Sequence, residues 1–132
     1  MNNTRYPLSA VLNGEADCFC CIYVLYAGDT PLYVGKTALS AGVRLLDHVR
    51  SSDLVGQYYD ANRPDSDNWQ VAFVPMEERA LLTVEKRMIG ELRPCFNSAH
   101  NPNPRPLPAG VREFVSFAER CPPAILNFGS LT

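Results

Sequence analysis

The chain has 132 residues, of which 46% are hydrophobic and 20% are charged, so we expect one globular domain that can bury its own core. Twelve Lys and Arg residues against fourteen Asp and Glu residues give a formal net charge of −2. This balance excludes a histone-like protein that binds nucleic acid through its overall positive field, although it allows a local basic patch. The longest uncharged apolar run, 18–27, has about half of the roughly 20 residues that span a bilayer, and no targeting segment precedes it. We therefore expect a cytoplasmic protein without a membrane segment.

The first half of the chain predicts a short arm, a β-hairpin and a helix. Residues 1–17 are polar and weakly patterned, which favours an N-terminal arm or a short lead-in helix. Residues 18–26 are β-branched and aromatic without a charge, which indicates a strand buried on both faces. The turn residues in 27–31 then predict a hairpin whose second strand covers 32–36. Residues 40–50 follow as a helix, with cap-type residues before it and apolar residues along one side.

The second half predicts one more strand and two more helices. Residues 51–67 are polar, and we expect them to form a long loop. Residues 68–76 alternate in hydrophobicity as a third strand, and 77–92 form the strongest helix, which Pro94 ends. A short last helix is expected over 111–119.

The order strand, strand, helix, strand, helix, helix predicts an α+β fold. We expect a small three-stranded antiparallel sheet, made of the hairpin plus the third strand, flanked by helices. Its core is expected to span residues 18–100. Residues 1–17 would precede this core as an arm, and residues 101–132 would add a Pro-rich segment, a short helix and a tail packed on the core.

The helix predicted over 77–92 carries a carboxylate within its apolar stripe. At 100° per residue Glu85 falls among the residues that would face the core, namely Leu81, Val84, Met88, Ile89 and Leu92. A buried carboxylate is costly unless it is neutralised, paired with a cation or bound to a metal ion. Glu85 is therefore a candidate functional residue, with a structural Glu–Arg pair or a rotated helix as the alternatives.

Two further pairs of side chains are candidates. Arg44 and His48 are four residues apart and are expected on the polar side of the first predicted helix, where Arg suits phosphate and His suits proton transfer. Tyr23 and Tyr33 would share one face of the hairpin if its turn has an odd number of residues, and Gly35 beside them would leave room for a close approach. The alternatives are a solvated helix face for the first pair and plain packing for the second.

The candidate residues follow one another in a defined order along the chain. The motifs are Cys21-Ile22-Tyr23, Tyr33-Val34-Gly35-Lys36-Thr37, Arg44-x-x-x-His48, Glu85 and Pro94-x-x-Asn97. This pattern resembles the GIY-YIG nuclease family over the stretch from Cys20 to Asn97. Cys21 stands where that family usually carries Gly, and Val34 stands where it usually carries Ile.

The resemblance implies an endonuclease that hydrolyses phosphodiester bonds in DNA with one Mg²⁺ or Mn²⁺ ion. Glu85 would be the metal ligand, which suits Mg²⁺ because this ion needs only one or two protein carboxylates. Arg44 would bind the non-bridging phosphate oxygens and stabilise the charge of the transition state. Gly35 and Lys36 would border the bound substrate.

The resemblance also implies roles for the remaining residues. Tyr23 would activate the attacking water, and because a phenol with a pKa of about 10 is a weak base at neutral pH, we expect its pKa to be lowered. His48 would help as a proton relay and Lys36 as a positive neighbour. Tyr33 would orient substrate or water, and Asn97 would hold the loop after the last core helix.

Two other functions stay open from the sequence. One is a catalytically silent nucleic-acid-binding or protein-interaction module on the same fold, and the other is a nuclease toxin or effector held by a partner. The complete set of Tyr23, Arg44, His48 and Glu85 favours the enzyme over the silent module. Cutting both DNA strands with one small site would need two copies, so a homodimer is a further alternative.

Overall fold

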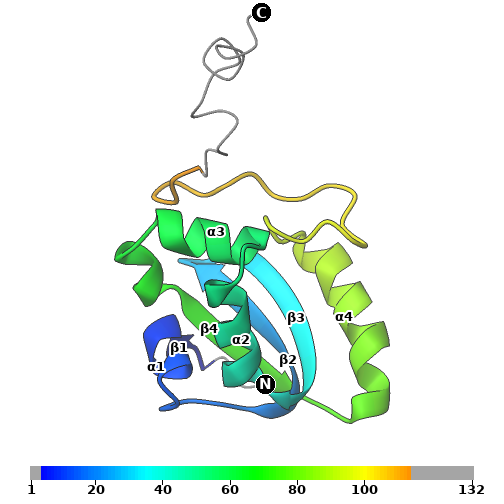
Figure 1. Cartoon of the computed structure of the whole chain (residues 1–132). Helices are drawn as coiled ribbons and strands as arrows, with labels where there is room; N and C mark the ends of the chain where they lie inside the picture. The colour runs from blue at the N-terminus through cyan, green and yellow to red at the C-terminus, as the bar shows by residue number, and fades with distance from the viewer. Residues whose placement is uncertain (1–3, 114–132) are drawn as a thin grey trace, which may run out of the picture.

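The fold is built on a four-stranded antiparallel sheet (Figure 1). The computed structural model describes residues 4–113. The strands stand in the order β1-β4-β2-β3, with β1 at Tyr6–Pro7, β4 at Gln70–Pro75, β2 at Phe19–Ala27 and β3 at Thr30–Ser40. The predicted α+β class is confirmed, whereas the prediction of three strands is wrong because the sheet has a fourth.

The fourth strand comes from the predicted N-terminal arm. Tyr6 and Pro7 form β1 and pair with β4, and helix α1 (Leu8–Leu12) follows directly. Leu8 and Val11 of this helix are buried in the core. A strand of two residues is too short to show alternating hydrophobicity, so the sequence pattern could not reveal it.

β2 and β3 form the predicted hairpin, and the register of this hairpin decides which side chains share a face. Gly28 in the turn has a φ of 60°, a left-handed conformation that glycine adopts readily. After the turn the register shifts by one residue, because Tyr26 lies opposite Pro31 whereas Leu25 lies opposite Tyr33. The shift leaves one extra residue in β3, which is the geometry of a β-bulge.

Two helices confirm the helices predicted on either side of the third strand. α2 (Ala41–Arg50) begins after Ser40, whose side chain accepts a hydrogen bond from Val43 N. α4 (Glu78–Leu92) follows β4. Among the helices of residues 4–113, none combines the length and the apolar character that crossing a membrane requires.

The polar segment 51–67 is not the long loop expected from the sequence. It contains helix α3 (Leu54–Ala61) and the start of the short 3₁₀ helix η1 (Asp65–Asn68). Asp53 caps α3 by accepting a hydrogen bond from Gly56 N at 2.9 Å. Eight residues that include a glycine and several polar side chains give too weak a helical pattern for detection, and packing against the core stabilises the helix instead.

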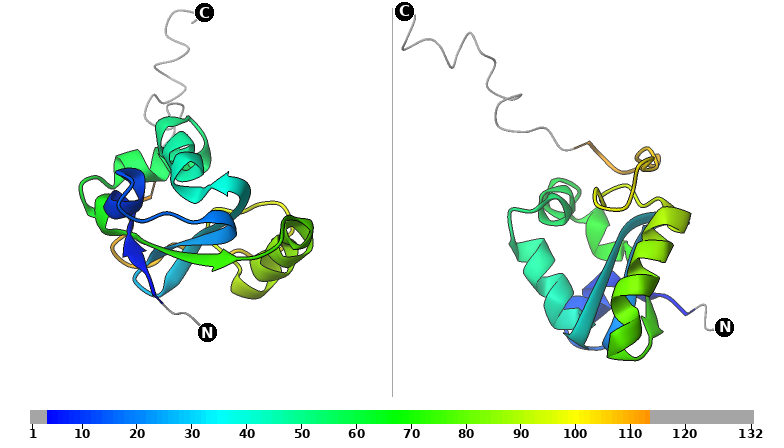
Figure 2. Two further views of the ribbon diagram at one scale, coloured as in Figure 1. Left: turned by 90° about the horizontal axis from the view of Figure 1, so that it is seen from below. Right: turned by 90° about the vertical axis from the view of Figure 1, so that its right-hand side faces the viewer.

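Helices cover both faces of the sheet, which makes three layers (Figure 2). α1, α2 and α3 lie on one face, and α4 lies on the other across β2 and β3. The first core includes Tyr23, Leu25, Leu45 and Val71, and the second includes Ile22, Val24, Val34, Leu81 and Ile89. Successive residues of β2 therefore alternate between the two cores, as a strand buried on both faces requires.

The chain after α4 returns along the outer edge of β3. Cys95 N donates to Pro31 O at 3.2 Å, and Phe96 N donates to Leu32 O at 2.8 Å. This pairing covers the first half of the edge strand. The second half of β3 borders the candidate site.

Residues 101–113 are held against the core by arginine side chains that donate to backbone carbonyls. Arg105 Nε donates to Leu92 O at 2.6 Å, and Arg112 Nη2 donates to Ala61 O at 2.8 Å. This segment therefore runs from the end of α4 across to α3 (Figure 1). Most of the helix predicted over 111–119 lies outside the described residues.

Candidate active site

Tyr23 of β2 and Tyr33 of β3 lie on the same face of the sheet, although the turn has two residues and not the odd number on which the prediction depended. A two-residue turn alone would place Tyr23 opposite Val34, and the two tyrosines would then occupy opposite faces. The one-residue register shift after the turn moves Tyr23 opposite Gly35 instead. The two ring centroids are consequently 6.4 Å apart.

Gly35 provides the space that the Tyr23 ring occupies. A Cβ atom at Gly35 would lie 2.6 Å from Tyr23 Cε2 and closer still to Cζ and Oη. The sequence predicted that Gly35 leaves room for a close approach, and the group that makes this approach is the Tyr23 side chain. Any side chain at position 35 would therefore displace the phenol.

We expect Gly35→Ala to lower the free energy of unfolding by about 1–3 kcal/mol, because it overpacks a filled site. Gly90→Ala in α4 is the matched control, since its added Cβ would have no heavy atom within 4 Å apart from its chain neighbours and the backbone of its own helix. That change should be neutral or raise the free energy of unfolding by up to about 1 kcal/mol, because Ala favours a helix. Urea denaturation measures both variants, and an unchanged Gly35→Ala protein would contradict the packing described here.

His48 faces the tyrosines, which corrects the prediction that it lies on the polar side of its helix. Its side chain is only 7% exposed. α2 buries Ala41, Leu45 and His48, which are spaced along one helical stripe, whereas Arg44 one turn earlier is exposed. Arg44 therefore lies on the exposed side of α2, whereas His48 lies on its buried side.

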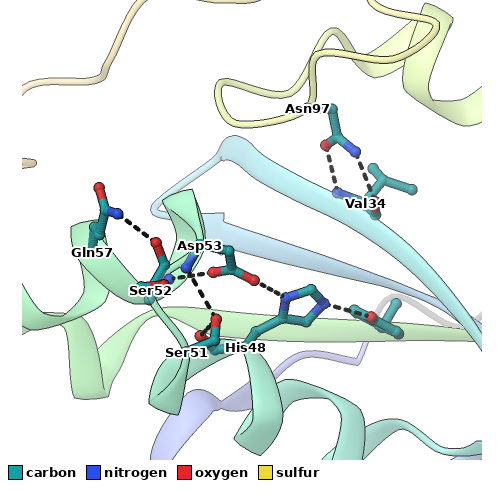
Figure 3. A network of polar contacts seen from close by, with 9 residues as sticks. Val34, His48, Ser51, Ser52, Asp53, Gln57 and Asn97 are labelled. Atoms are coloured by element: carbon teal, nitrogen blue, oxygen red, sulfur yellow. Dashed lines mark hydrogen bonds and ion pairs between the residues drawn. The ribbon is translucent and has the colours of Figure 1, made fainter.

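The His48 ring joins two oxygen atoms from different elements (Figure 3). Its Nε2 lies 3.2 Å from Tyr23 Oη, and its Nδ1 lies 2.8 Å from Asp53 Oδ2. The Tyr33 ring meets the imidazole edge-on, with the centroids 5.1 Å apart. A carboxylate, an imidazole and a phenol thus form one hydrogen-bonded chain from the start of α3 to β2.

The electrostatic environment of Tyr23 differs from the one predicted. Burial raises the pKa of Tyr23, Tyr33 raises it further, Arg44 lowers it and Glu85 raises it, and the net change is upward. Burial also raises the pKa of Tyr33, against the effect of Arg44. The expected lowering of the Tyr23 pKa is therefore wrong, and both phenols are protonated at neutral pH. The charges of Arg44 and Glu85 nevertheless act on both tyrosines.

Glu85 is a half-buried carboxylate on α4. Within residues 4–113 it forms no hydrogen bond and no ion pair, so the structural Glu–Arg pair considered from the sequence is not made there. Burial raises the pKa of Glu85, whereas Lys36 and His100 lower it. In the same part of the chain no cluster of three or more His, Cys, Asp or Glu residues is arranged to hold a metal ion. Glu85 is therefore a single carboxylate with free coordination capacity.

A hollow of about 410 Å³ separates the second half of β3 from α2 and α4. It is lined by Lys36, Thr37, Ala38, Arg44, Glu78, Leu81 and Leu82. Glu85 lies one helical turn after Leu81 and so on the same side of α4. The two cations on the walls of the hollow suit a phosphate group.

Asn97 supports the edge of β3. Val34 N donates to Asn97 Oδ1 at 2.9 Å, and Asn97 Nδ2 donates to Val34 O at 2.9 Å (Figure 3). The Asn97 amide thus makes the two hydrogen bonds that a neighbouring strand would make, and it holds the backbone of Val34, which lies between Tyr33 and Gly35. Asn101 Nδ2 donates to Asn97 O at 2.8 Å, so the loop after α4 is anchored to the same point.

Asp53 and His100 belong to this environment but were not predicted. The one sequence signal for Asp53 is its place three residues before Gly56, which suits a helix cap. That signal is weak in the sequence, because the polar segment 51–67 predicts a loop and therefore no helix for Asp53 to cap. His100 follows α4, and it lowers the pKa of Glu85. No sequence pattern indicates this effect, because it depends on how the folded chain places the two residues.

The structure brings most of the predicted site residues together. Tyr23, Tyr33 and His48 are in contact, and the charges of Arg44 and Glu85 act on the tyrosines. Comparison of the chain with models of protein families, with curated proteins and with solved structures finds no match. The functional argument therefore rests on the residues of the site.

Proposed function

We propose that the chain is a metal-dependent endonuclease of the GIY-YIG type, which hydrolyses phosphodiester bonds in DNA. The observation that carries the proposal is the contact of 3.2 Å between Tyr23 Oη and His48 Nε2, beside the charges of Arg44 and Glu85. Metal-dependent phosphodiester hydrolysis uses a proton acceptor for water, a cation for the phosphate and a ligand for the metal ion. Side chains of β2, α2 and α4 would supply these three functions, and the charges of Arg44 and Glu85 act on both tyrosines.

Glu85 would hold the metal ion. Its carboxylate is unpaired within residues 4–113, and Mg²⁺ completes its coordination with water and phosphate oxygens when a protein offers one or two carboxylates. The bound ion would neutralise charge on the scissile phosphate and on the leaving oxygen. Burial raises the pKa of Glu85 and Lys36 lowers it, so Lys36 would help to keep the carboxylate ionised.

Tyr23 and His48 would take the proton of the attacking water together. Burial raises the pKa of Tyr23, so a free phenolate is not available at neutral pH. Tyr23 would therefore accept the water proton while it passes its own proton to His48 Nε2. The bond from the water oxygen to phosphorus forms, the bond to the leaving oxygen breaks, and the leaving oxygen takes a proton from solvent.

Arg44→Ala is expected to slow single-turnover cleavage by about 10²–10³-fold, because it removes a fixed donor to charge that develops in the transition state. DNA binding, measured by gel mobility shift, should weaken much less. Arg50→Ala removes an exposed cation from the end of the same helix and is the matched control. Equal losses of rate and binding would instead make Arg44 a substrate-positioning contact.

The proposed activity is tested by incubating the protein with end-labelled duplex DNA and Mg²⁺ or Mn²⁺, with and without a chelator. A metal-dependent endonuclease shortens the labelled strand only when the metal ion is free. A catalytically silent DNA-binding module would retard the duplex in a native gel but leave its length unchanged. DNA that stays intact both with Mg²⁺ and with Mn²⁺ would overturn the proposal.

A further inference from the structure

Asp53 connects His48 to the first turn of α3 (Figure 3). Its Oδ2 lies 2.8 Å from His48 Nδ1, and its Oδ1 accepts a hydrogen bond from Gly56 N at 2.9 Å. Its backbone N donates to Ser51 Oγ at 3.1 Å, and that hydroxyl donates to His48 O at 3.0 Å. Both carboxylate oxygens and the backbone of Asp53 are therefore held in place.

The hydrogen between Asp53 and His48 can be assigned from this geometry. Burial raises the pKa of Asp53, but its hydrogen bonds, chiefly those from Gly56 N and from His48, lower it more, so the group is a carboxylate at neutral pH. An ionised carboxylate only accepts hydrogen bonds. At a separation of 2.8 Å, His48 Nδ1 must then carry the hydrogen.

We propose that Asp53 is a positioning residue, which holds His48 in the tautomer with hydrogen on Nδ1 so that Nε2 accepts the hydroxyl hydrogen of Tyr23. The catalytic meaning of this tautomer rests on the nuclease function proposed above. In the neutral imidazole the Tyr23–His48 hydrogen bond then has one direction, from phenol to imidazole. This is the direction in which a proton must move when water is activated. Asp53 also balances the positive charge that His48 gains in that step.

The other groups that face His48 agree with this assignment. Tyr23 comes from β2 and Tyr33 from β3, and burial raises the pKa of both, so they are neutral. Arg44 lies one turn earlier on α2 and is exposed. Asp53 is thus the anion in contact with the ring, and a tautomer with an unprotonated Nδ1 would set a lone pair against its carboxylate.

Asp53→Asn changes the tautomer of His48 while it keeps the helix cap that the fold uses. Asn keeps an oxygen that can cap Gly56 N and is itself a favoured cap residue. Its NH₂ group would donate to His48 Nδ1, which moves the ring hydrogen to Nε2 and removes the acceptor for Tyr23. Asp53→Ser is a second variant that keeps the cap without an amide donor. Asp47→Asn makes the same chemical change at an exposed residue next to His48 and is the matched control.

The tautomer is measured by ¹⁵N NMR of imidazole-labelled protein near neutral pH. The chain has two histidines, so the spectrum of a His100→Gln variant assigns the signals of His48. We expect the hydrogen on Nδ1 in the wild-type protein and in Asp47→Asn, and on Nε2 in Asp53→Asn. A wild-type ring with its hydrogen on Nε2 would overturn the proposal without any reference to activity.

The rate of single-turnover DNA cleavage provides the second readout. Loss of the proton acceptor should slow Asp53→Asn by about 10²-fold or more, with unchanged DNA binding, whereas Asp47→Asn should cleave at the wild-type rate. Asp53→Ser should lose rate less than Asp53→Asn, because its His48 can still adopt the productive tautomer. Wild-type activity in Asp53→Asn would refute the positioning role. If the tautomers are as expected but the wild-type protein leaves DNA intact, the proposed function fails and the assignment of the His48 tautomer stands.

Discussion

Glu85→Gln is expected to reduce metal-dependent DNA cleavage to background while leaving the protein folded. Gln keeps the volume of the side chain but removes the anionic oxygen that would bind Mg²⁺. Glu91→Gln makes the same change at an exposed position of α4 and should cleave at the wild-type rate. Single-turnover cleavage of labelled duplex measures both variants, and wild-type activity in Glu85→Gln would remove Glu85 from the site.

Glu85→Gln should lose activity but should not lose stability. Burial raises the pKa of Glu85 above its usual value near 4.5, so the folded state holds this proton more tightly than the unfolded state. The wild-type protein therefore loses stability as pH rises from the unfolded pKa through the folded pKa, and the loss stays constant above that window. Because Gln carries no charge, thermal unfolding at pH 7 without metal should show Glu85→Gln at least as stable as wild type. A large drop in its melting temperature would instead make Glu85 a structural residue.

Tyr23→Phe is expected to slow cleavage by about 10²–10⁴-fold, because it removes the group that passes the water proton to His48. It also leaves the buried His48 Nε2 without its partner, which should lower the free energy of unfolding by about 1–3 kcal/mol. Tyr33→Phe should reduce the rate less, since its proposed role is orientation. If Tyr33→Phe loses the rate and Tyr23→Phe keeps it, the two roles are reversed.

The pH dependence of the wild-type rate separates this relay from a free phenolate. Burial and Tyr33 raise the pKa of Tyr23, so the ionised phenol remains a very small fraction between about pH 6 and 9.5. We expect that the single-turnover rate does not rise toward pH 9.5 in a way that depends on the Tyr23 hydroxyl. Comparison with the pH profile of Tyr23→Phe tests this dependence. Such a rise would show that the ionised phenol of Tyr23 acts as the base alone.

Most elements of the fold could be predicted because their signals are local. The apolar runs of β2 and β4 and the apolar stripes of α2 and α4 each extend over six or more residues. β1 and α3 could not be predicted in the same way. β1 has two residues, and α3 has only eight and includes a glycine, so contacts with distant parts of the chain stabilise both.

The residues of the candidate site could be predicted, but their geometry depends on details that the sequence pattern does not resolve. Tyr23 and Tyr33 share a face only because the hairpin register shifts by one residue. His48 points inward because of the phase of α2, which a spacing of four from Arg44 does not define. Asp53 could be recognised only after α3 and its cap were known. In each case a small change in backbone geometry decides which functional groups meet.

Cleavage of supercoiled plasmid tests the central claim most directly, namely that the site around Tyr23, His48, Arg44 and Glu85 hydrolyses DNA. Wild-type protein, Glu85→Gln and Glu91→Gln are purified in parallel and incubated with plasmid over a range of Mg²⁺ concentrations, with a chelator as the blank. We predict that wild type and Glu91→Gln convert the plasmid to nicked or linear forms at a rate that saturates with Mg²⁺, and that Glu85→Gln leaves it supercoiled. Equal cleavage by all three proteins, or cleavage by none, would contradict the account.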